Sequence, residues 1–210
     1  MWSGKKCSDS AAGTPTAEEE VKVVLVGDTQ CGKTSLVQRF VSDTFIEAYT
    51  PTGFEKYGYT CTVADYRVNF SVWDTSGTTA YDTVRPLAYQ DARIFMLCFN
   101  VAEPESLHNA AAKWYREVRT HGGSAPVLLC GCKADLRHDK ETVAMLSKLR
   151  SHPVTSEEET VAMLSKLRSH PVTSEEETVA MLSKLRSHPV TSEEVSTAAI
   201  RLPLVLRNIS

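Results

Sequence analysis

Apolar residues along the chain fall into short continuous runs that alternate with segments of helical spacing. The valine-rich run at 21–26 predicts a buried strand, and residues 34–40 follow it with the apolar spacing of a helix. Runs at 94–101 and 126–131 predict two more buried strands, and the spacing at 105–120 predicts another helix. Because strands and helices alternate, the sequence predicts an α/β fold with a mostly parallel, doubly wound sheet.

One pair of strands interrupts this alternation. Residues 60–63 and 67–73 alternate in polarity around a turn at 64–66, and the second strand ends at Asp74. In the second predicted helix one face is apolar, with Leu107, Ala110, Ala111, Trp114 and Val118. We expect Trp114 to be a core residue, because an aromatic at helical spacing usually packs against the sheet.

A glycine-rich loop joins the first strand to the first helix. Its sequence GDTQCGKT at 27–34 matches G-x-x-x-x-G-K-[ST], in which backbone N–H groups, a lysine and a hydroxyl bind a nucleoside triphosphate with its Mg²⁺. The predicted phosphate-binding residues are Gly27, Asp28, Thr29, Gln30, Cys31, Gly32, Lys33 and Thr34. A chance glycine turn is the weaker reading, because a strand precedes the loop and a helix follows it.

Two further motifs follow predicted strands, where doubly wound sheets bind ligands. The DTSG motif offers Asp74 to the Mg²⁺ shell and the Gly77 N–H to a γ-phosphate, although it could be an ordinary turn. The CKAD motif begins at Cys132. Its Asp135 carboxylate can accept hydrogen bonds from the two N–H donors of guanine, with the Lys133 stem against the base. The alternative is that Lys133 and Asp135 are solvent-exposed residues of an ordinary loop. If the two residues bind a base, the motif selects GTP over ATP.

These motifs resemble those of the Ras superfamily of small GTPases, within it the Rho family, and most closely the atypical Rnd subgroup. The resemblance covers about residues 20–158. The matching stretches are GDTQCGKT, YTPTGFEKY at 49–57, WDTSG at 73–77, VRPLAY at 84–89 and GCKADLR at 131–137. The resemblance implies a P-loop small GTPase fold, GTP or GDP and Mg²⁺ as cofactors, and signal transduction to the actin cytoskeleton and cell shape.

The resemblance also implies roles for single residues. Phe45 would pack against guanine, Tyr49 would close over the phosphates, and Thr34, Thr52 and Asp74 would hold Mg²⁺. The full nucleotide-binding set is Gly27, Asp28, Thr29, Gln30, Cys31, Gly32, Lys33, Thr34, Ser35, Phe45, Tyr49, Thr52, Asp74, Gly77, Cys132, Lys133 and Asp135. Effector proteins would bind switch I and switch II through Phe54, Glu55, Tyr57, Trp73 and Tyr81, and Rho regulators are further expected partners.

Two departures from the family concern hydrolysis. Thr78 stands where the family has a glutamine that orients the attacking water, and Thr29 replaces a glycine that leaves room for water and an arginine finger. An arginine finger contributes about 10³–10⁵ in rate. We therefore expect GTP binding with little hydrolysis and assign no catalytic residue. A cycling GTPase switch is the alternative.

Other departures concern binding and the end of the chain. Cys132 replaces a hydrogen-bonding residue of the guanine motif, and Gly53 replaces an apolar residue of switch I. The family's final strand, its Ser-Ala guanine loop and its last helix are not recognisable. A fold without this C-terminal strand and helix would expose an apolar patch of the sheet. No prenylation motif is found, so no lipid anchor is expected.

The 18-residue unit ETVAMLSKLRSHPVTSEE occurs three times without change, over 141–194. One copy resembles the insert helix of Rho proteins. Each copy predicts a short helix, as at 143–150, and Ser156/Glu159 and Ser174/Glu177 predict capping boxes. A triplicated segment that prevents complete folding is the remaining alternative. We expect four regions: a flexible arm at 1–20, the GTPase domain at 21–140, the three copies at 141–194, and an unassigned tail at 195–210.

The bulk properties of the chain add limits. Its 210 residues suit one α/β domain with extra sequence, and the formal net charge of −3 gives no reason to expect nucleic-acid binding. The first residues have no apolar signal region, so we expect a cytoplasmic protein, with peripheral attachment to the plasma membrane as an alternative. Cys130 and Cys132 have the spacing of a metal-binding pair, but no second pair exists, so no zinc site is predicted.

Overall fold

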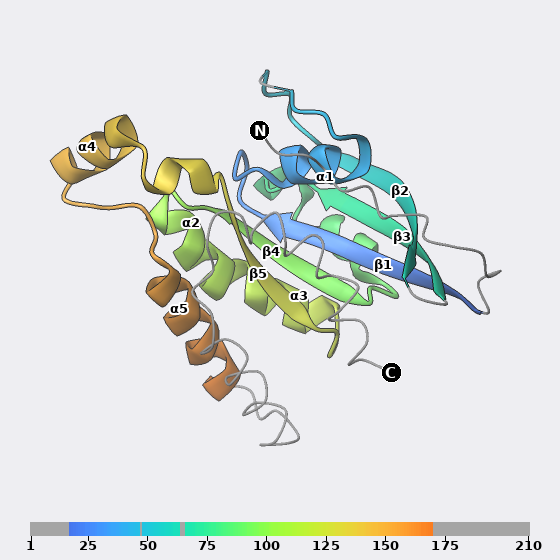
Figure 1. Cartoon of the computed structure of the whole chain (residues 1–210). Helices are drawn as coiled ribbons and strands as arrows, with labels where there is room; N and C mark the ends of the chain where they lie inside the picture. The colour runs from blue at the N-terminus through green and yellow to red at the C-terminus, as the bar shows by residue number, and fades with distance from the viewer. Residues whose placement is uncertain (1–16, 47, 64–65, 170–210) are drawn as a thin grey trace.

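The computed structural model describes residues 17–46, 48–63 and 66–169, and in them five strands form one sheet with the order β2-β3-β1-β4-β5 (Figure 1). The strands are β1 (Ala17–Gly27), β2 (Phe54–Val63), β3 (Tyr66–Thr75), β4 (Ile94–Asn100) and β5 (Val127–Cys132). All neighbouring pairs are parallel except β2 with β3, which is antiparallel. The five predicted strands and the mostly parallel sheet are confirmed, but β1 begins at Ala17, within the arm expected at 1–20, and β2 begins at Phe54 rather than at Thr60.

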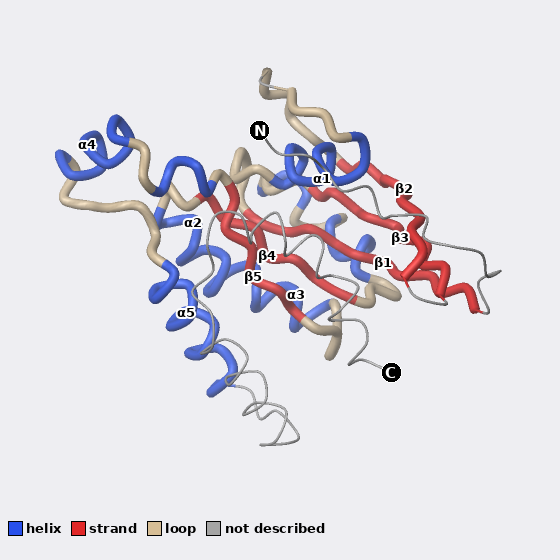
Figure 2. Tube along the Cα trace, in the orientation of Figure 1, coloured by secondary structure: helices blue, strands red, loops and turns tan. Residues whose placement is uncertain are grey.

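Helices lie on both sides of the sheet (Figure 2). One side carries α1 (Lys33–Ser42). The other carries a continuous helical run made of α2 (Pro104–Asn109), the π-turn η3 (Ala110–Trp114) and α3 (Tyr115–His121). The remaining helical elements are η1 (Thr79–Tyr81), η2 (Arg85–Tyr89), η4 (Ala134–Arg137), α4 (Lys140–Lys148) and α5 (Ser156–Ser169). The helix predicted at 105–120 is confirmed, but its π-turn has no counterpart in the prediction.

Two apolar clusters hold the layers together. Val24 and Val26 of β1 face the α2–α3 run, whereas Val23 and Leu25 face α1. All four are almost completely buried, which explains why β1 reads as a continuous apolar run rather than an alternating one. Trp114 belongs to the first cluster and is fully buried, as predicted.

The first two copies of the repeated unit have different surroundings. The first copy forms α4, which projects from the body (Figure 1) and leaves Met145 and Leu149 largely exposed. The second copy forms most of α5, which packs against α2 and η3. Ala162 of α5 joins the core cluster, whereas the equivalent Ala144 of α4 is exposed. The third copy, with its predicted capping box, and the tail lie outside the described residues.

Contacts at its first turn fix α5 to the body of the domain. The buried Val154 N–H donates to the Val101 carbonyl at 2.8 Å, and Arg137 Nε donates to the Val154 carbonyl at 3.0 Å. Arg137 also pairs with Glu159.

The capping box of α5 differs from the predicted pair Ser156/Glu159. The helix starts at Ser156, so Thr155 is the residue before it. Thr155 Oγ1 accepts from the Glu158 N–H at 3.3 Å, and Glu158 Oε2 accepts from the Thr155 N–H at 2.8 Å. The prediction was wrong by one residue, and Glu159 is left to bind Arg137.

The β5 edge of the sheet is uncovered within the described part of the chain. There β5 is an edge strand and no sixth strand follows it. On the α1 face, Met96, Leu128 and Cys130 are only partly buried. Because α5 packs on the opposite layer, it does not cover them. Among the described helices none combines the length and apolar character that crossing a membrane requires.

Candidate functional site

The loop between β1 and α1 has the backbone geometry of a phosphate-binding loop. Gly32 precedes α1 with φ 113°, a conformation that side-chain-bearing residues rarely adopt. A Cβ at Gly32 would lie 2.9 Å from Cβ of Cys132, so packing also requires glycine there. Lys33 is buried, and its Nζ donates to the carbonyls of Gly27 at 2.9 Å and Asp28 at 2.8 Å. The loop therefore holds its ammonium group at the N-terminus of a helix, where anions bind.

A cleft opens beside this loop, between it and two other segments. Its lining includes nine predicted residues: Thr29, Gln30, Gly32, Lys33, Thr34, Ser35, Tyr49, Thr52 and Gly77. The other lining residues are Gln38, Ile46, Ala48, Thr50, Thr75 and Ser76. The segments after β1, before β2 and after β3 thus meet at one cleft. The segments after β1 and β3 follow the carboxyl ends of their strands, where ligands bind in sheets of this kind, whereas no residue of the segment after Gly131 lines the cleft.

The remaining predicted residues do not line the cleft. Gly27, Asp28 and Cys31 belong to the glycine loop, where Gly27 and Asp28 bind Lys33 through their carbonyls. Phe45 is 65% exposed, and Lys133 and Asp135 are exposed on the loop that follows β5.

Three oxygen-bearing side chains meet at the inner end of the cleft. Thr34 Oγ1 donates to Asp74 Oδ2 at 2.5 Å and lies 2.8 Å from Thr52 Oγ1. Since the Thr34 proton is directed to the carboxylate, Thr52 donates in the second contact. Asp74 Oδ1 is buried and has no hydrogen-bond partner. Burial raises the pKa of Asp74, although the Thr34 hydrogen bond and the Lys33 charge act in the opposite direction.

This arrangement fits a hard divalent cation. Mg²⁺ prefers oxygen ligands and uses few carboxylates, which matches the two hydroxyls and single carboxylate of Thr34, Thr52 and Asp74. A buried carboxylate oxygen without a donor is costly unless a cation neutralises it. The donor set predicted for magnesium is therefore brought together by α1, β3 and the loop before β2.

Gly77 packs directly on the phosphate loop. A Cβ at this position would lie 2.4 Å from the Thr29 nitrogen and 2.5 Å from the Gly27 carbonyl oxygen. No side chain fits at such distances. From the sequence, Gly77 is expected because a γ-phosphate needs space beside it. The structure adds a second reason, because the backbone at Gly77 contacts the backbone of the phosphate loop.

The segment predicted to bind guanine lies beside the same loop. Cys132 is buried at the end of β5, and Lys133 has a left-handed backbone with φ 57°. A Cβ at Gly32 would come within 4.0 Å of Lys133 Cγ, so the lysine stem passes close to the phosphate loop. This contact places the CKAD motif next to GDTQCGKT, although Lys133 lies 101 positions after Gly32 in the sequence.

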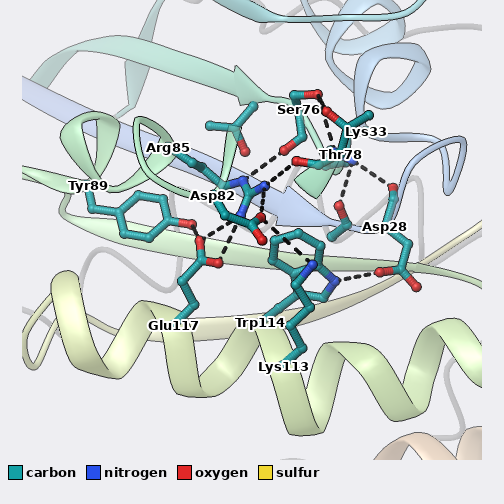
Figure 3. A network of polar contacts seen from close by, with 12 residues as sticks. Asp28, Lys33, Ser76, Thr78, Asp82, Arg85, Tyr89, Lys113, Trp114 and Glu117 are labelled. Atoms are coloured by element: carbon teal, nitrogen blue, oxygen red, sulfur yellow. Dashed lines mark hydrogen bonds and ion pairs between the residues drawn. The ribbon is translucent and has the colours of Figure 1, made fainter. Parts of the chain in front are cut away.

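A clamp on Asp28 connects the phosphate loop to the helical run (Figure 3). Trp114 Nε1 donates to Asp28 Oδ1 at 2.7 Å, and Asn109 Nδ2 donates to Asp28 Oδ2 at 2.8 Å. Residues five apart point in different directions on an α-helix. The π-turn between Asn109 and Trp114 widens the helix locally and brings both donors to one carboxylate.

Arg85 connects the segment after β3 to the same helical run (Figure 3). Its side chain is fully buried and donates to the carbonyls of Ser76 and Thr78, each at 2.8 Å. Its Nη1 also donates to both carboxylate oxygens of Glu117. The guanidinium carbon lies 4.6 Å from the centroid of the Trp114 ring. Burial lowers the pKa of Arg85, but its acidic partners more than offset this, so the net shift is upward.

Sequence reasoning missed the functional role of four residues: Asn109, Trp114, Arg85 and Glu117. A signal existed for Trp114, because a buried indole N–H needs an acceptor. For Arg85 the signal was an arginine beside a proline in a segment with few other charges. Neither signal names the partner, which in the case of Trp114 lies 86 residues away.

The fold and the site define a P-loop nucleotide-binding protein. The Ras family model matches residues 22–168, so the chain belongs to the Ras family, and its relatives place it in the Rho group. The match continues past residue 140 into the second copy of the repeated unit.

Three relatives illustrate the similarity. Rho-related GTP-binding protein RhoE of Homo sapiens is 40% identical over 154 residues, which cover 73% of this chain and 63% of RhoE. GTP-binding protein rho1 of Schizosaccharomyces pombe is 47% identical over 137 residues, covering 65% of this chain and 68% of rho1. Rho-related GTP-binding protein RhoD of Homo sapiens is 46% identical over 147 residues, covering 69% and 70%. The chain thus spans less than two thirds of the length of RhoE.

Proposed function

We propose that this protein binds GTP with Mg²⁺ in the cleft beside the glycine loop and hydrolyses it slowly or not at all. The meeting of Lys33, Thr34, Thr52 and Asp74 at one end of the cleft supports the nucleotide and its metal. The Lys133 and Asp135 loop beside Gly32 supports guanine as the base. The names of the relatives RhoE and rho1, both called GTP-binding proteins, support the same ligand.

The observation that carries slow hydrolysis is the position of Thr78. Its hydroxyl lies 3.2 Å from Ser76 Oγ, and its carbonyl accepts from Arg85 at 2.8 Å. Thr78 is not among the residues that line the cleft. A short side chain held in this way cannot orient a water molecule for attack. Thr29 does line the cleft, and its branched side chain takes space that an arginine finger needs.

Nucleotide content tests the first part of the proposal. The purified chain is denatured, and the released nucleotide is identified by chromatography. We expect GTP in a molar ratio near one. Bound GDP would favour a cycling switch, and no nucleotide at all would favour an incompletely folding product.

Single-turnover hydrolysis tests the second part. The combined change Thr29→Gly and Thr78→Gln restores what the family uses, so we expect hydrolysis stimulated by a Rho GTPase-activating protein to rise by at least about 10³-fold. Thr79→Gln is the control, because it places the same side chain one residue further along an exposed turn. Stimulated hydrolysis by the unmodified chain at the rate of the double variant would refute the proposal.

The exposed residues at the start of β2 and in the segment after β3 support an effector surface. Phe54 packs edge-on against Tyr81 with ring centroids 5.4 Å apart, so the start of β2 contacts the η1 turn that follows β3. Lys22 lies 4.1 Å from the centroid of the Trp73 ring, which is half-buried. Glu55 binds the Tyr57 hydroxyl. We propose that effector proteins contact this surface and that it changes with the bound nucleotide.

A further inference from the structure

Three cysteines gather at the end of the sheet next to the nucleotide cleft. Cys98 on β4 is the register partner of Cys130 on β5, and Cys132 is two residues further along β5, hence on the same face. The three Sγ atoms all lie within 4.8 Å of one another. The neighbouring strands therefore bring together a third thiol that the spacing of Cys130 and Cys132 alone does not reveal.

The distances suit a tetrahedral thiolate site. Zinc–sulfur bonds of about 2.3 Å place ligand sulfurs about 3.8 Å apart, a contraction that small side-chain rotations can supply. Two of these thiols make only long hydrogen bonds to backbone carbonyls: Cys98 Sγ is 3.9 Å from the Met96 oxygen and Cys132 Sγ is 4.0 Å from the Cys130 oxygen. An ion would replace weak contacts rather than strong ones.

Access differs among the three residues. Cys98 and Cys132 are buried, whereas Cys130 is partly exposed on the α1 face beside Met96 and Leu128. This side gives an ion a path from solvent to the cluster. Sulfur ligands favour soft cations over Mg²⁺, so the cluster would not compete for the metal of the nucleotide site.

We propose that Cys98, Cys130 and Cys132 bind one Zn²⁺ ion. Three S–H bonds break, three Zn–S bonds form, and the protons pass to solvent, so no oxidant or reductant takes part. Cys132 is also the first residue of the CKAD motif and packs against Gly32. The proposed ion therefore lies beneath the junction of the phosphate loop and the predicted guanine-binding loop, but its binding does not require a nucleotide.

Cadmium titration of the full, reduced and metal-free chain tests the site. We expect a thiolate-to-cadmium charge-transfer band that saturates at one ion per chain and is removed by competing Zn²⁺ but not by Mg²⁺. Because binding displaces thiol protons, apparent affinity should increase as the pH rises. Absence of the band at one equivalent of Cd²⁺ would overturn the proposal.

Matched serine variants locate the ion. Cys130→Ser should weaken Cd²⁺ binding by at least about 100-fold, because loss of a ligand exceeds the 10–100-fold effect of losing a group behind one. Cys61→Ser is the control: Cys61 is a partly buried cysteine on β2, separated from the cluster by β3 and β1. Circular dichroism establishes that both variants fold. Equal affinities in the two variants would place the ion elsewhere and overturn the assignment.

Discussion

Asp74 destabilises the protein when no metal is bound, and it is the carboxylate of the proposed magnesium site. Its carboxylate is buried, only Oδ2 has a hydrogen bond, and Oδ1 has no partner. The pKa is raised because burial disfavours the charged form. A group held in this state fits a cation-binding residue better than a structural one.

Asp74→Asn should therefore separate stability from binding. We expect the nucleotide-free protein to gain about 1 kcal/mol in unfolding free energy at neutral pH, because a buried charge is removed, and Mg²⁺ to lose its effect on nucleotide release. Denaturant unfolding and the release of a fluorescent guanine nucleotide, with and without Mg²⁺, measure the two effects. Asp91→Asn is the control, since Asp91 is exposed. If both variants kept the Mg²⁺ effect, Asp74 would not be part of the metal site.

The same variant has a predictable pH dependence. The pKa of Asp74 in the folded state lies above its ordinary value of 3.8, so folding takes up a proton between these two values. The contribution of this group to stability is greatest when it is protonated and falls as the pH rises through that window. Asp74→Asn should lack this fall, whereas Asp91→Asn should keep it.

Gly77 is a second residue at which a small change, the addition of one Cβ atom, has a predictable effect. Gly77→Ala would place a Cβ within 2.4–2.6 Å of three atoms of the phosphate-loop backbone, so we expect a loss of about 1–3 kcal/mol in stability and a faster release of nucleotide. Gly58→Ala is the matched control, because nothing lies within 4 Å of a Cβ there. Urea unfolding of both variants provides the measurement. Equal unfolding midpoints would contradict the close approach of Gly77 to the loop.

At the scale of elements, the identical units show how far surroundings decide structure. Glu141 in α4 and Glu159 in α5 occupy the same place in the repeated sequence, yet Glu141 is exposed and Glu159 pairs with Arg137. No reading of the unit alone can distinguish them. The difference comes from Val154 and Arg137, which fix only the second helix to the domain.

Glu159→Gln should loosen α5, and Glu141→Gln should not. Removing the carboxylate leaves the mostly buried Arg137 guanidinium without its charged partner, which costs about 1–3 kcal/mol. We expect faster amide hydrogen exchange over 156–162 in the first variant only. Unchanged exchange in both variants would mean that apolar packing by Ala162 and Val154 holds α5 without the ion pair.

Features of the fold that depend on residues close together in the sequence could be predicted, whereas features that depend on contacts between distant residues could not. The runs that became β1, β4 and β5 are continuous apolar stretches, so the local sequence alone identifies them as strands. The start of β2 at Phe54 was not predicted, because the strand is at the sheet edge and residues 54–56 are exposed. The π-turn keeps the apolar period of an α-helix, and its effect is visible only in the bonds to Asp28.

The residues of the candidate site differ in the same way, since some follow from a local motif and others depend on contacts between distant segments. Residues of the glycine loop follow from one local motif, and nine predicted residues line the cleft. The Asp28 clamp and the Arg85 network join segments 32 to 86 residues apart and carry no local pattern. The thiol cluster likewise depends on strand register, which places Cys98 beside Cys130.

At the scale of the whole molecule, the number of copies of the repeated unit determines whether the domain is complete. The first copy supplies α4, and the start of the second supplies α5 through Ser169. Deleting residues 159–176 moves the identical third copy into the place of the second, so Arg137 again meets a glutamate and the core again receives an alanine. We expect this two-copy variant to match the full chain in thermal unfolding midpoint and nucleotide content.

Deleting residues 159–194 should have a different result. Val195 would then occupy the place of Glu159, and Pro203 would fall at position 167, inside the helix that α5 forms. An interior proline costs a helix about 3 kcal/mol or more, and Arg137 would lose its partner. We expect a lower unfolding midpoint and less bound nucleotide than in the two-copy variant, measured side by side. Equal values for the two variants would show that α5 does not contribute to the stability of the nucleotide-binding domain.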